Sequence, residues 1–264
     1  MTSTPLIELK NISLNRGEIA VFRDLNLSLP QKAHSLILGP NGAGKSSLIK
    51  LILRDLYPLA RRDSNISILG NQNRDVLSLR GQFGVVSDEL QHRFEGAETA
   101  LQVVASGFYS SIGTWQHQRF DESQLERVRK LMEQLGVSSL AERSYNSLST
   151  GQQRRLLLAR AMVHDPEYLL MDEPTSGLDP EATFRYLDLV RGLMQQGKYL
   201  VLVTHHIHEI PPEVNQVFML RSGELFAQGN RAEVLNSETL STLYDSPMEL
   251  VERNGFYQVF PAQQ

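Results

Sequence analysis

Apolar and polar residues alternate with a period of two near the start of the chain. Residues 6–14 and 18–29 place apolar side chains at every second position over much of their length, and Asn15-Arg16-Gly17 separates the two stretches. This period is typical of strands with one buried face, and a glycine between them favours a turn. The pattern predicts an antiparallel β subdomain at the N-terminus.

Longer apolar runs of strand length recur along the rest of the chain. These runs are residues 34–38, 65–69, 83–87, 167–172 and 198–204. Several are followed by helical spacing, and such alternation predicts a largely parallel α/β sheet. Residues 217–220 and 225–227, joined by a turn at 221–224, predict a hairpin near the end of the core.

Between Gln91 and Asn146 only helical spacing is found. Residues 99–108 and 122–135 carry it, and the loop between them is rich in aromatic residues. We expect a helical lobe, residues 91–146, inserted into a core domain that spans residues 1–229. Residues 230–264 are expected to form a short C-terminal extension with one helix at 231–235 and little further pattern.

Composition narrows the function classes. The chain has 264 residues, 41% of them hydrophobic, no cysteine and a net charge of −4. A disulfide scaffold and cysteine-bound zinc are therefore excluded, and the acidic balance disfavours a surface that coats nucleic acid. No segment approaches the roughly 20 consecutive apolar residues of a membrane-spanning helix, and the polar first residues do not resemble a signal peptide.

The most informative motif runs from Gly39 to Ser46 and reads Gly-Pro-Asn-Gly-Ala-Gly-Lys-Ser. It lies between an apolar strand and a helical pattern, which is the context that a phosphate-binding loop requires. Glycines allow backbone N–H groups to face phosphate oxygens, the lysine reaches the terminal phosphates, and the serine hydroxyl binds Mg²⁺. The predicted nucleotide-contacting residues are Gly39, Pro40, Asn41, Gly42, Ala43, Gly44, Lys45, Ser46 and Ser47.

Two adjacent carboxylates end the apolar run at 167–172. In a phosphate-loop enzyme, Asp172 would hold Mg²⁺ together with Ser46, and Glu173 would orient or deprotonate the attacking water. An acidic helix cap after a strand is the alternative interpretation. The neighbouring phosphate loop favours the catalytic one.

A second candidate anion site is Leu148-Ser149-Thr150-Gly151-Gln152, which precedes a helix with an apolar face. A serine hydroxyl, a glycine N–H and the helix N-terminus together favour negative charge. By itself the segment is a good N-cap and nothing more.

These motifs, with Ser176-Gly177-Leu178-Asp179 and Val203-Thr204-His205, follow the order and approximate spacing of the ATP-binding-cassette (ABC) ATPases. The resemblance covers residues 6–229. It implies an α/β fold with a RecA-like phosphate-loop core, a mixed sheet and an inserted helical lobe. It also implies ATP and Mg²⁺ as cofactors and ATP hydrolysis as the activity. Residues 103–113 and 204–210 are similar to a molybdate-type and photorepair-type subset.

The resemblance further implies that two copies of the chain sandwich two ATP molecules head to tail. Ser149, Gly151 and Gln152 would contact nucleotide held by the other copy, and Asp179 would lie on a loop that crosses the interface. His205 would be the switch histidine at the γ-phosphate. The separation in sequence between Lys45 and the second anion site agrees, because a two-fold dimer brings together what a single fold cannot easily join.

The sequence departs from the family in three places. Arg16 stands where an aromatic residue usually stacks on adenine, and a guanidinium can also stack on a base. Asp88 aligns with the usual magnesium-ligating glutamine, although Gln91 lies three residues later and both could be plain loop residues. Thr150 replaces a glycine.

His205, His206 and His208 raise the alternative of a metal site. Neighbouring histidines rarely point the same way at the end of a strand, and no cysteine or carboxylate cluster accompanies them, so a metal site is disfavoured.

Three function hypotheses follow. The first is a transporter motor at the cytoplasmic face of a membrane, attached to separate integral-membrane permease subunits. Its docking patch would be the aromatic residues of the lobe, which could equally pack the lobe's own core: Phe108, Tyr109, Trp115 and Phe120.

The second hypothesis is a soluble, non-transport ABC ATPase that acts on a protein, ribosome or nucleic-acid partner. Such proteins commonly carry paired cassettes or a long coiled-coil insertion, which this chain lacks, and no nucleic-acid partner is expected. The third is a regulator without turnover. Lys45, Asp172, Glu173 and His205 argue against it.

Overall fold

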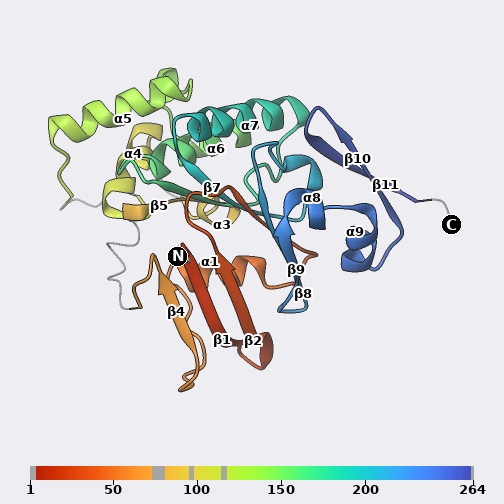
Figure 1. Cartoon of the computed structure of the whole chain (residues 1–264). Coiled ribbons are helices and arrows are strands. Elements are labelled where there is room, and N and C mark those ends of the chain that lie inside the picture. Colours follow the sequence, from red (N-terminus) through yellow and green to blue (C-terminus); the bar gives the residue numbers. More distant parts are fainter. Residues whose placement is uncertain (1–3, 73–80, 95–97, 114–117, 263–264) are drawn as a thin grey trace. The chain divides into compact units, whose positions relative to one another are not determined.

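The computed structural model describes residues 4–72, 81–94, 98–113 and 118–262. Figure 1 shows its helices and strands, coloured along the sequence. The chain divides into two compact units. The first unit comprises residues 1–79 and 199–264, and the second comprises residues 80–198. Trp115, one of the predicted lobe aromatics, lies outside the described residues. None of the helices among the described residues is long and apolar enough to cross a bilayer.

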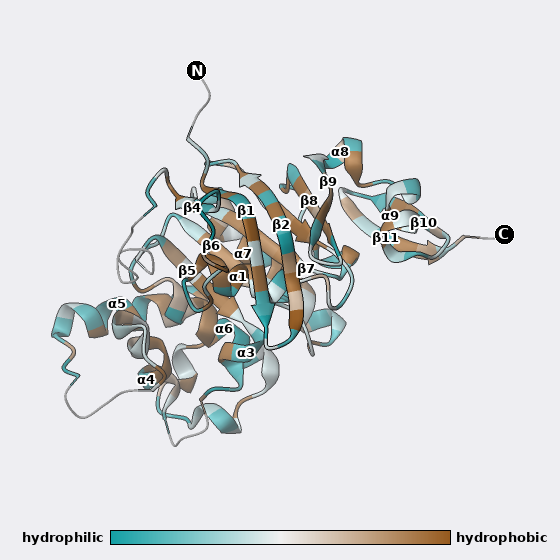
Figure 2. Cartoon of the chain, turned by 90° about the horizontal axis from the view of Figure 1, so that it is seen from below, coloured by the Kyte–Doolittle hydropathy of each residue, from teal (hydrophilic) through white to brown (hydrophobic). Residues whose placement is uncertain are grey.

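The first unit contains the predicted antiparallel β subdomain. Strands β1 (Ile7–Arg16), β2 (Ile19–Leu29) and β4 (Asn65–Ile68) form a sheet in the order β2-β1-β4. Apolar and polar residues alternate along these strands (Figure 2), and the apolar side chains of β1 are buried. The run at 65–69 was expected in the parallel sheet. That expectation is wrong, because β4 pairs antiparallel with β1.

A second sheet of this unit carries the phosphate-loop motif. Strands β3 (Ser35–Leu38), β7 (Tyr199–Thr204), β8 (Gln216–Arg221) and β9 (Glu224–Asn230) lie in the order β7-β3-β8-β9. The first three run parallel and β9 is antiparallel, so the predicted mixed sheet and hairpin are confirmed. β3 is completely buried, as a central parallel strand should be, and helix α1 (Lys45–Ile52) follows it.

The C-terminal residues of the first unit contain more structure than the sequence pattern predicted. Beyond α8 (Arg231–Val234) there are a helix, α9 (Ser237–Tyr244), and a hairpin of β10 (Met248–Arg253) and β11 (Phe256–Pro261). Both turn residues have positive φ, 54° at Asn254 and 82° at Gly255. An Asn-Gly pair between alternating segments is a strong hairpin signal, and it was available in the sequence.

The second unit holds a parallel strand pair and most of the helices that the structure describes. Strands β5 (Phe83–Ser87) and β6 (Tyr168–Asp172) run parallel in register. The helices are α3 (Asp88–Gln91), α4 (Ala100–Ala105), α5 (Glu122–Gln134), α6 (Thr150–Ala161) and α7 (Pro180–Gln195). Short 3₁₀ turns are η1 (Ser106–Tyr109), η2 (Ser138–Leu140) and η3 (Tyr145–Ser147). The first unit contains one more such turn among its described residues, η4 (Ile207–Glu209).

The α/β fold class is thus confirmed. The predicted helical lobe at 91–146 lies within the second unit, and its described residues form helices and turns with one isolated β-bridge, Thr99 to Ser144. The domain boundaries 1–229 and 230–264 stay a prediction. Residues 230–264 nevertheless belong to the same compact unit as the phosphate-loop motif.

Candidate functional site

The phosphate-loop motif of the first unit begins where β3 ends. A Cβ atom on Gly39 would lie 2.2 Å from the backbone oxygen of Leu220, so only glycine fits there. Gly42 and Gly44 have φ of +82° and +100°, which side chains rarely adopt. The chain therefore needs glycine at all three positions to make this turn.

Lys45 is folded into the motif. Its side chain is 6% exposed, and its Nζ donates hydrogen bonds to the backbone oxygens of Gly39 (2.8 Å) and Pro40 (3.2 Å). Helix α1 starts at this residue with Gly44 as N-cap, and no side chain caps its first turn. A helix start with uncapped N–H donors, a lysine ammonium and no acidic residue in the first turn fits a phosphate group.

The remaining residues of the motif differ in exposure. Asn41 and Ser46 are exposed, whereas Ala43 and Ser47 are buried. Ser46 can therefore offer its hydroxyl outward from the first turn of α1. Ser47 is buried in the first turn of α1, and its predicted nucleotide contact stays a prediction.

His205 follows β7 in a turn that has its own hydrogen bonds. The Thr204 hydroxyl donates to the buried Glu209 carboxylate at 2.6 Å and accepts from the backbone N–H of His206 at 2.9 Å. From α9, the Tyr244 hydroxyl donates to the backbone oxygen of His205 at 3.3 Å. Hydrogen bonds within the turn and one from α9 thus stabilise the turn that contains the predicted switch histidine.

The three histidines of this turn lie closer together than the sequence argument allowed. The ring centroids of His205 and His206 are 3.8 Å apart, and those of His206 and His208 are 5.4 Å apart. The expectation that neighbouring histidines point apart is wrong. A short turn follows β7 directly, so the side chains do not alternate as they would along a strand.

Arg16, the predicted adenine-stacking residue, is the last residue of β1. It is exposed and pairs with Ile19 across the turn, where Gly17 has φ of +60°. A long side chain at the tip of a hairpin is placed to reach outward, but its contact with a base stays a prediction.

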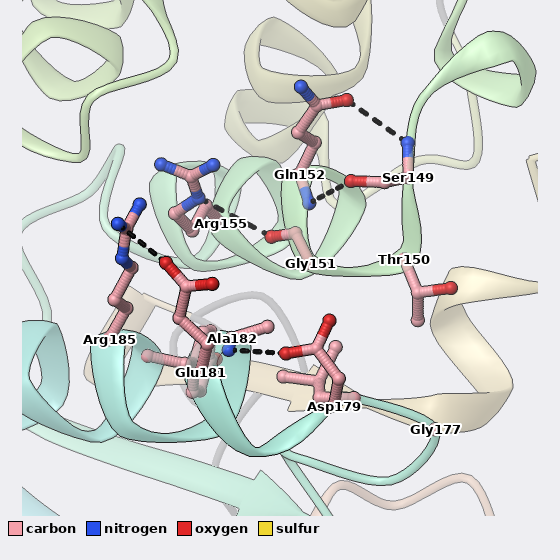
Figure 3. A pocket seen from close by; sticks show the side chains of 12 residues that line it. Ser149, Thr150, Gly151, Gln152, Arg155, Gly177, Asp179, Glu181, Ala182 and Arg185 are labelled. Atoms are coloured by element: carbon pink, nitrogen blue, oxygen red, sulfur yellow. Dashed lines mark hydrogen bonds and ion pairs between the residues drawn. The ribbon is translucent and has the colours of Figure 1, made fainter.

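In the second unit, the segment from Ser149 to Gln152 begins helix α6 with a capping box (Figure 3). The Ser149 hydroxyl oxygen accepts from the backbone N–H of Gln152 at 3.3 Å, and the Gln152 side-chain oxygen accepts from the N–H of Ser149 at 3.0 Å. The Ser149 O–H proton is still available to an external acceptor. The segment is therefore a complete N-cap that retains one donor.

The start of α6 lines a cavity of about 320 Å³ together with the start of α7 (Figure 3). Asp179 caps α7, its Oδ1 accepting from the N–H of Ala182 at 2.8 Å. Arg155, Arg185 and Glu181 also line the cavity, and Arg185 is paired with Glu181 at 2.7 Å. Burial lowers the pKa of Arg155, and the charge of Arg185 lowers it further. The structure thus brings Ser149, Gly151, Gln152 and Asp179 to one cavity.

Asp172 and Glu173 stand at the end of β6. Asp172 is the last strand residue, and Glu173 has a φ of +46°, in the left-handed region. This conformation costs energy in a residue other than glycine, and such strain gathers at functional sites. It turns the chain sharply, and the Ser176 N–H then donates to the Glu173 backbone oxygen at 3.2 Å.

Asp88 and Gln91, the two candidates for the missing glutamine, already have partners. The Asp88 carboxylate accepts from Arg154 at 2.6 Å, and Gln91, 6% exposed, donates to the Gln153 side chain at 2.8 Å. The predicted Mg²⁺ ligation by Asp88 stays untested. Sequence reasoning gave no role to Arg154 or Tyr244, because the hydrogen-bond partner of each lies far away in sequence.

Comparisons with family models and with known proteins point to the same family. A protein-family model described as ABC transporter matches residues 22–176. An uncharacterised ABC transporter ATP-binding protein of Bacillus subtilis is 32% identical over 251 residues, 93% of each chain. A cobalt import ATP-binding protein of Rhodobacter capsulatus is 33% identical over 221 residues, 83% of this chain and 76% of that protein.

Solved structures agree. The fold of a dimeric bacterial ABC transporter cassette matches with a TM-score of 0.70 and 25% identity, covering 85% of this chain and 98% of the other.

Proposed function

This chain belongs to the ABC transporter family of ATP-binding proteins, and from that premise we propose that it is the ATP-hydrolysing subunit of a transporter. The observation that carries the proposal is the phosphate loop. Its glycines are required by the backbone, its lysine lies inside the turn, and the first turn of α1 has no side-chain cap. ABC ATPases hydrolyse ATP, and this loop provides the N–H donors and the cation that a triphosphate needs.

We assign the magnesium ion to Ser46 and Asp172. A hydroxyl and a carboxylate are oxygen ligands of the kind that Mg²⁺ prefers, and bound Mg²⁺ would supply charge neutralisation at the β- and γ-phosphates. Glu173 is the proposed general base, and its backbone has the left-handed conformation that directly follows β6. His205 is proposed to contact the γ-phosphate.

A second copy of the chain is the proposed partner in catalysis. The cavity beside Ser149 and Gly151 combines a helix start, a hydroxyl donor and Arg155, which favour an anion, whereas Arg185 is already paired with Glu181. A two-fold dimer would place this cavity over nucleotide held by the partner copy, and Asp179 would lie at the interface. The related cassette named as dimeric supports this assembly.

We further propose that integral-membrane permease subunits hold the dimer at the cytoplasmic face of a membrane. Relatives are named as cobalt import and energy-coupling factor transporter ATP-binding proteins. In the lobe, Tyr109 is 43% exposed while its ring packs edge-on against Phe120, 5.5 Å between centroids. Tyr109 is therefore available to a partner, whereas Phe108 packs on His164.

The experiment for hydrolysis compares phosphate release by the wild-type chain, E173Q and E167Q with saturating ATP and Mg²⁺. Removal of a general base costs about 10²–10⁴ in rate, so E173Q should lose turnover while it retains nucleotide. Glu167 is exposed, just ahead of β6, and E167Q should behave as wild type. Undiminished phosphate release by E173Q would remove Glu173 as the base.

The experiment for transport is affinity purification of the chain from detergent-solubilised membranes of its own organism. Recovery of a polytopic membrane protein, reduced by Y109A, supports docking through the lobe. Recovery of ribosomes or of soluble proteins alone would contradict the transporter assignment.

A further inference from the structure

Arg154 is a buried cation one helical turn after the nucleotide-contacting start of α6. Its side chain has no exposed surface, whereas the side chain of its partner Asp88 is 51% exposed. The Arg154 Nη2 donates to Asp88 Oδ1 at 2.6 Å and, more weakly, to the backbone oxygen of Ser176 at 3.4 Å. Among the described residues, no hydrogen-bond partner is found for its Nε and Nη1.

The surroundings of Arg154 offer little other compensation for its charge. The buried hydroxyls of Tyr145 and Tyr186 likewise have no hydrogen-bond partner among the residues described. Burial raises the pKa of both phenols, and the nearby charge of Arg154 partly opposes this rise. Asp88 is thus the one carboxylate that forms an ion pair with Arg154 in the described part of the chain. A buried charge that loses its carboxylate is strongly destabilised, so this pair fixes where α6 can lie.

The three segments that meet at this guanidinium all lead to predicted site residues. Asp88 begins α3, at the entrance to the helical lobe. Arg154 belongs to α6, whose first turn holds Ser149 and Gly151. Ser176 lies between Glu173 and Asp179 in the loop after β6.

We propose that Asp88 and Arg154 are a pair of positioning residues that couples the loop after β5 to the start of α6 and to the loop between Glu173 and Asp179. Asp88 then acts on hydrolysis through Arg154, in place of the metal contact expected at its position. The inference rests on the proposed function, because its readout is hydrolysis at a site completed by a second copy.

The experiment is a double-mutant cycle in the full chain: D88N, R154Q and D88N/R154Q, with D88E as the conservative variant. E122Q is the matched control, because Glu122 pairs with Arg129 at 2.8 Å with both side chains exposed. We measure kcat, KM for ATP, the Mg²⁺ concentration for half-maximal rate, nucleotide affinity of the monomer and thermal unfolding.

We expect D88N and R154Q each to lower kcat about tenfold, with monomer affinity and Mg²⁺ requirement unchanged, and the double variant to be no worse than either one. D88E should retain most of the rate because it keeps the carboxylate. E122Q should match wild type. If R154Q does not fold, the kcat values of D88N, D88E and E122Q still test the proposal. Asp88 is the exposed member of the pair, so we expect its variants to fold.

Three results would overturn the inference. An increased Mg²⁺ requirement in D88N but not in R154Q makes Asp88 a metal ligand. Losses in kcat that multiply make the two residues independent, and lowered thermal stability with full kcat makes the pair merely structural. If the wild-type chain does not hydrolyse ATP, the proposed function itself is wrong, and the inference that rests on it is wrong as well.

Discussion

The starts of α1 and α6 are both helix N-termini suited to an anion, yet they are built in opposite ways. The start of α1 leaves its N–H donors without a side-chain cap, and glycines shape the turn before it. The start of α6 is closed by its own capping box between Ser149 and Gln152. The first is therefore ready for phosphate within one chain. The second needs no ligand for its stability, so it is suited to a contact that forms and breaks with each cycle.

The largest expected effect comes from closing the first of these sites. In G39A the added methyl group would lie 2.2 Å from the Leu220 oxygen. Overpacking of this kind costs about 1–3 kcal/mol, so ATP affinity should fall by up to about 100-fold. Fluorescence titration with a labelled nucleotide measures it. In G192A, a helical site with nothing within 4 Å, affinity should remain unchanged; equal affinity in G39A would contradict the account.

The matching change in the second site should separate binding from hydrolysis. In G151A the new methyl group would meet Ala182 Cβ at 3.4 Å, an ordinary contact, so the fold should be retained. The methyl group lines the cavity, however, and should lower kcat by roughly 10–100-fold through misplacement of the contact with the partner's nucleotide. Monomer affinity for ATP should not change. A G151A variant with full kcat would exclude this cavity from the reaction.

A smaller effect is expected at the edge of the first site. R16A should weaken ATP and GTP binding only two- to fivefold, since a stacked guanidinium contributes about 0.5–1 kcal/mol at an exposed position. Parallel titrations of both nucleotides check this. Unchanged affinities for both would show that Arg16 does not cover the base.

The scaffold of the first site should also respond to pH. Burial lowers the pKa of His34 below 6.5, although the charge of Glu213 partly opposes this, and its Nδ1 accepts from the Leu200 N–H at 3.2 Å. The folded state thus prefers the neutral ring. Stability should be complete above pH 6.5 and decline as the pH falls toward the folded pKa, where the unfolded chain binds more protons. Urea unfolding at several pH values tests this, and H34Q should remove that part of the decline.

The sequence pattern predicted the phosphate loop of the first unit, but it did not predict the ion pair between Asp88 and Arg154 in the second unit. The phosphate loop is contiguous, so glycine spacing, strand and helix are all local signals. The role of Arg154 depends on Asp88, which lies 66 residues away, and no local pattern indicates a buried partner. Strand β4 was misplaced for the same reason, since an apolar run does not reveal which sheet it joins.

The C-terminal hairpin is a different case. Its Asn254-Gly255 turn is a local signal, but the charged residues of β10 make the alternating pattern of that strand hard to recognise. β10 carries Glu249, Glu252 and Arg253 among its apolar residues. Helix α9 could not be linked to the His205 turn from sequence, because Tyr244, which donates a hydrogen bond to this turn, lies 39 residues away from His205.

The central claim is that two copies of this chain complete each other's nucleotide sites. The most direct test is the mass of E173Q by light scattering, first with ATP and Mg²⁺ and then with ADP and Mg²⁺. We predict a dimer with ATP and a monomer with ADP. An E173Q chain that binds ATP yet stays monomeric at high concentration, with and without its membrane partner, would contradict it.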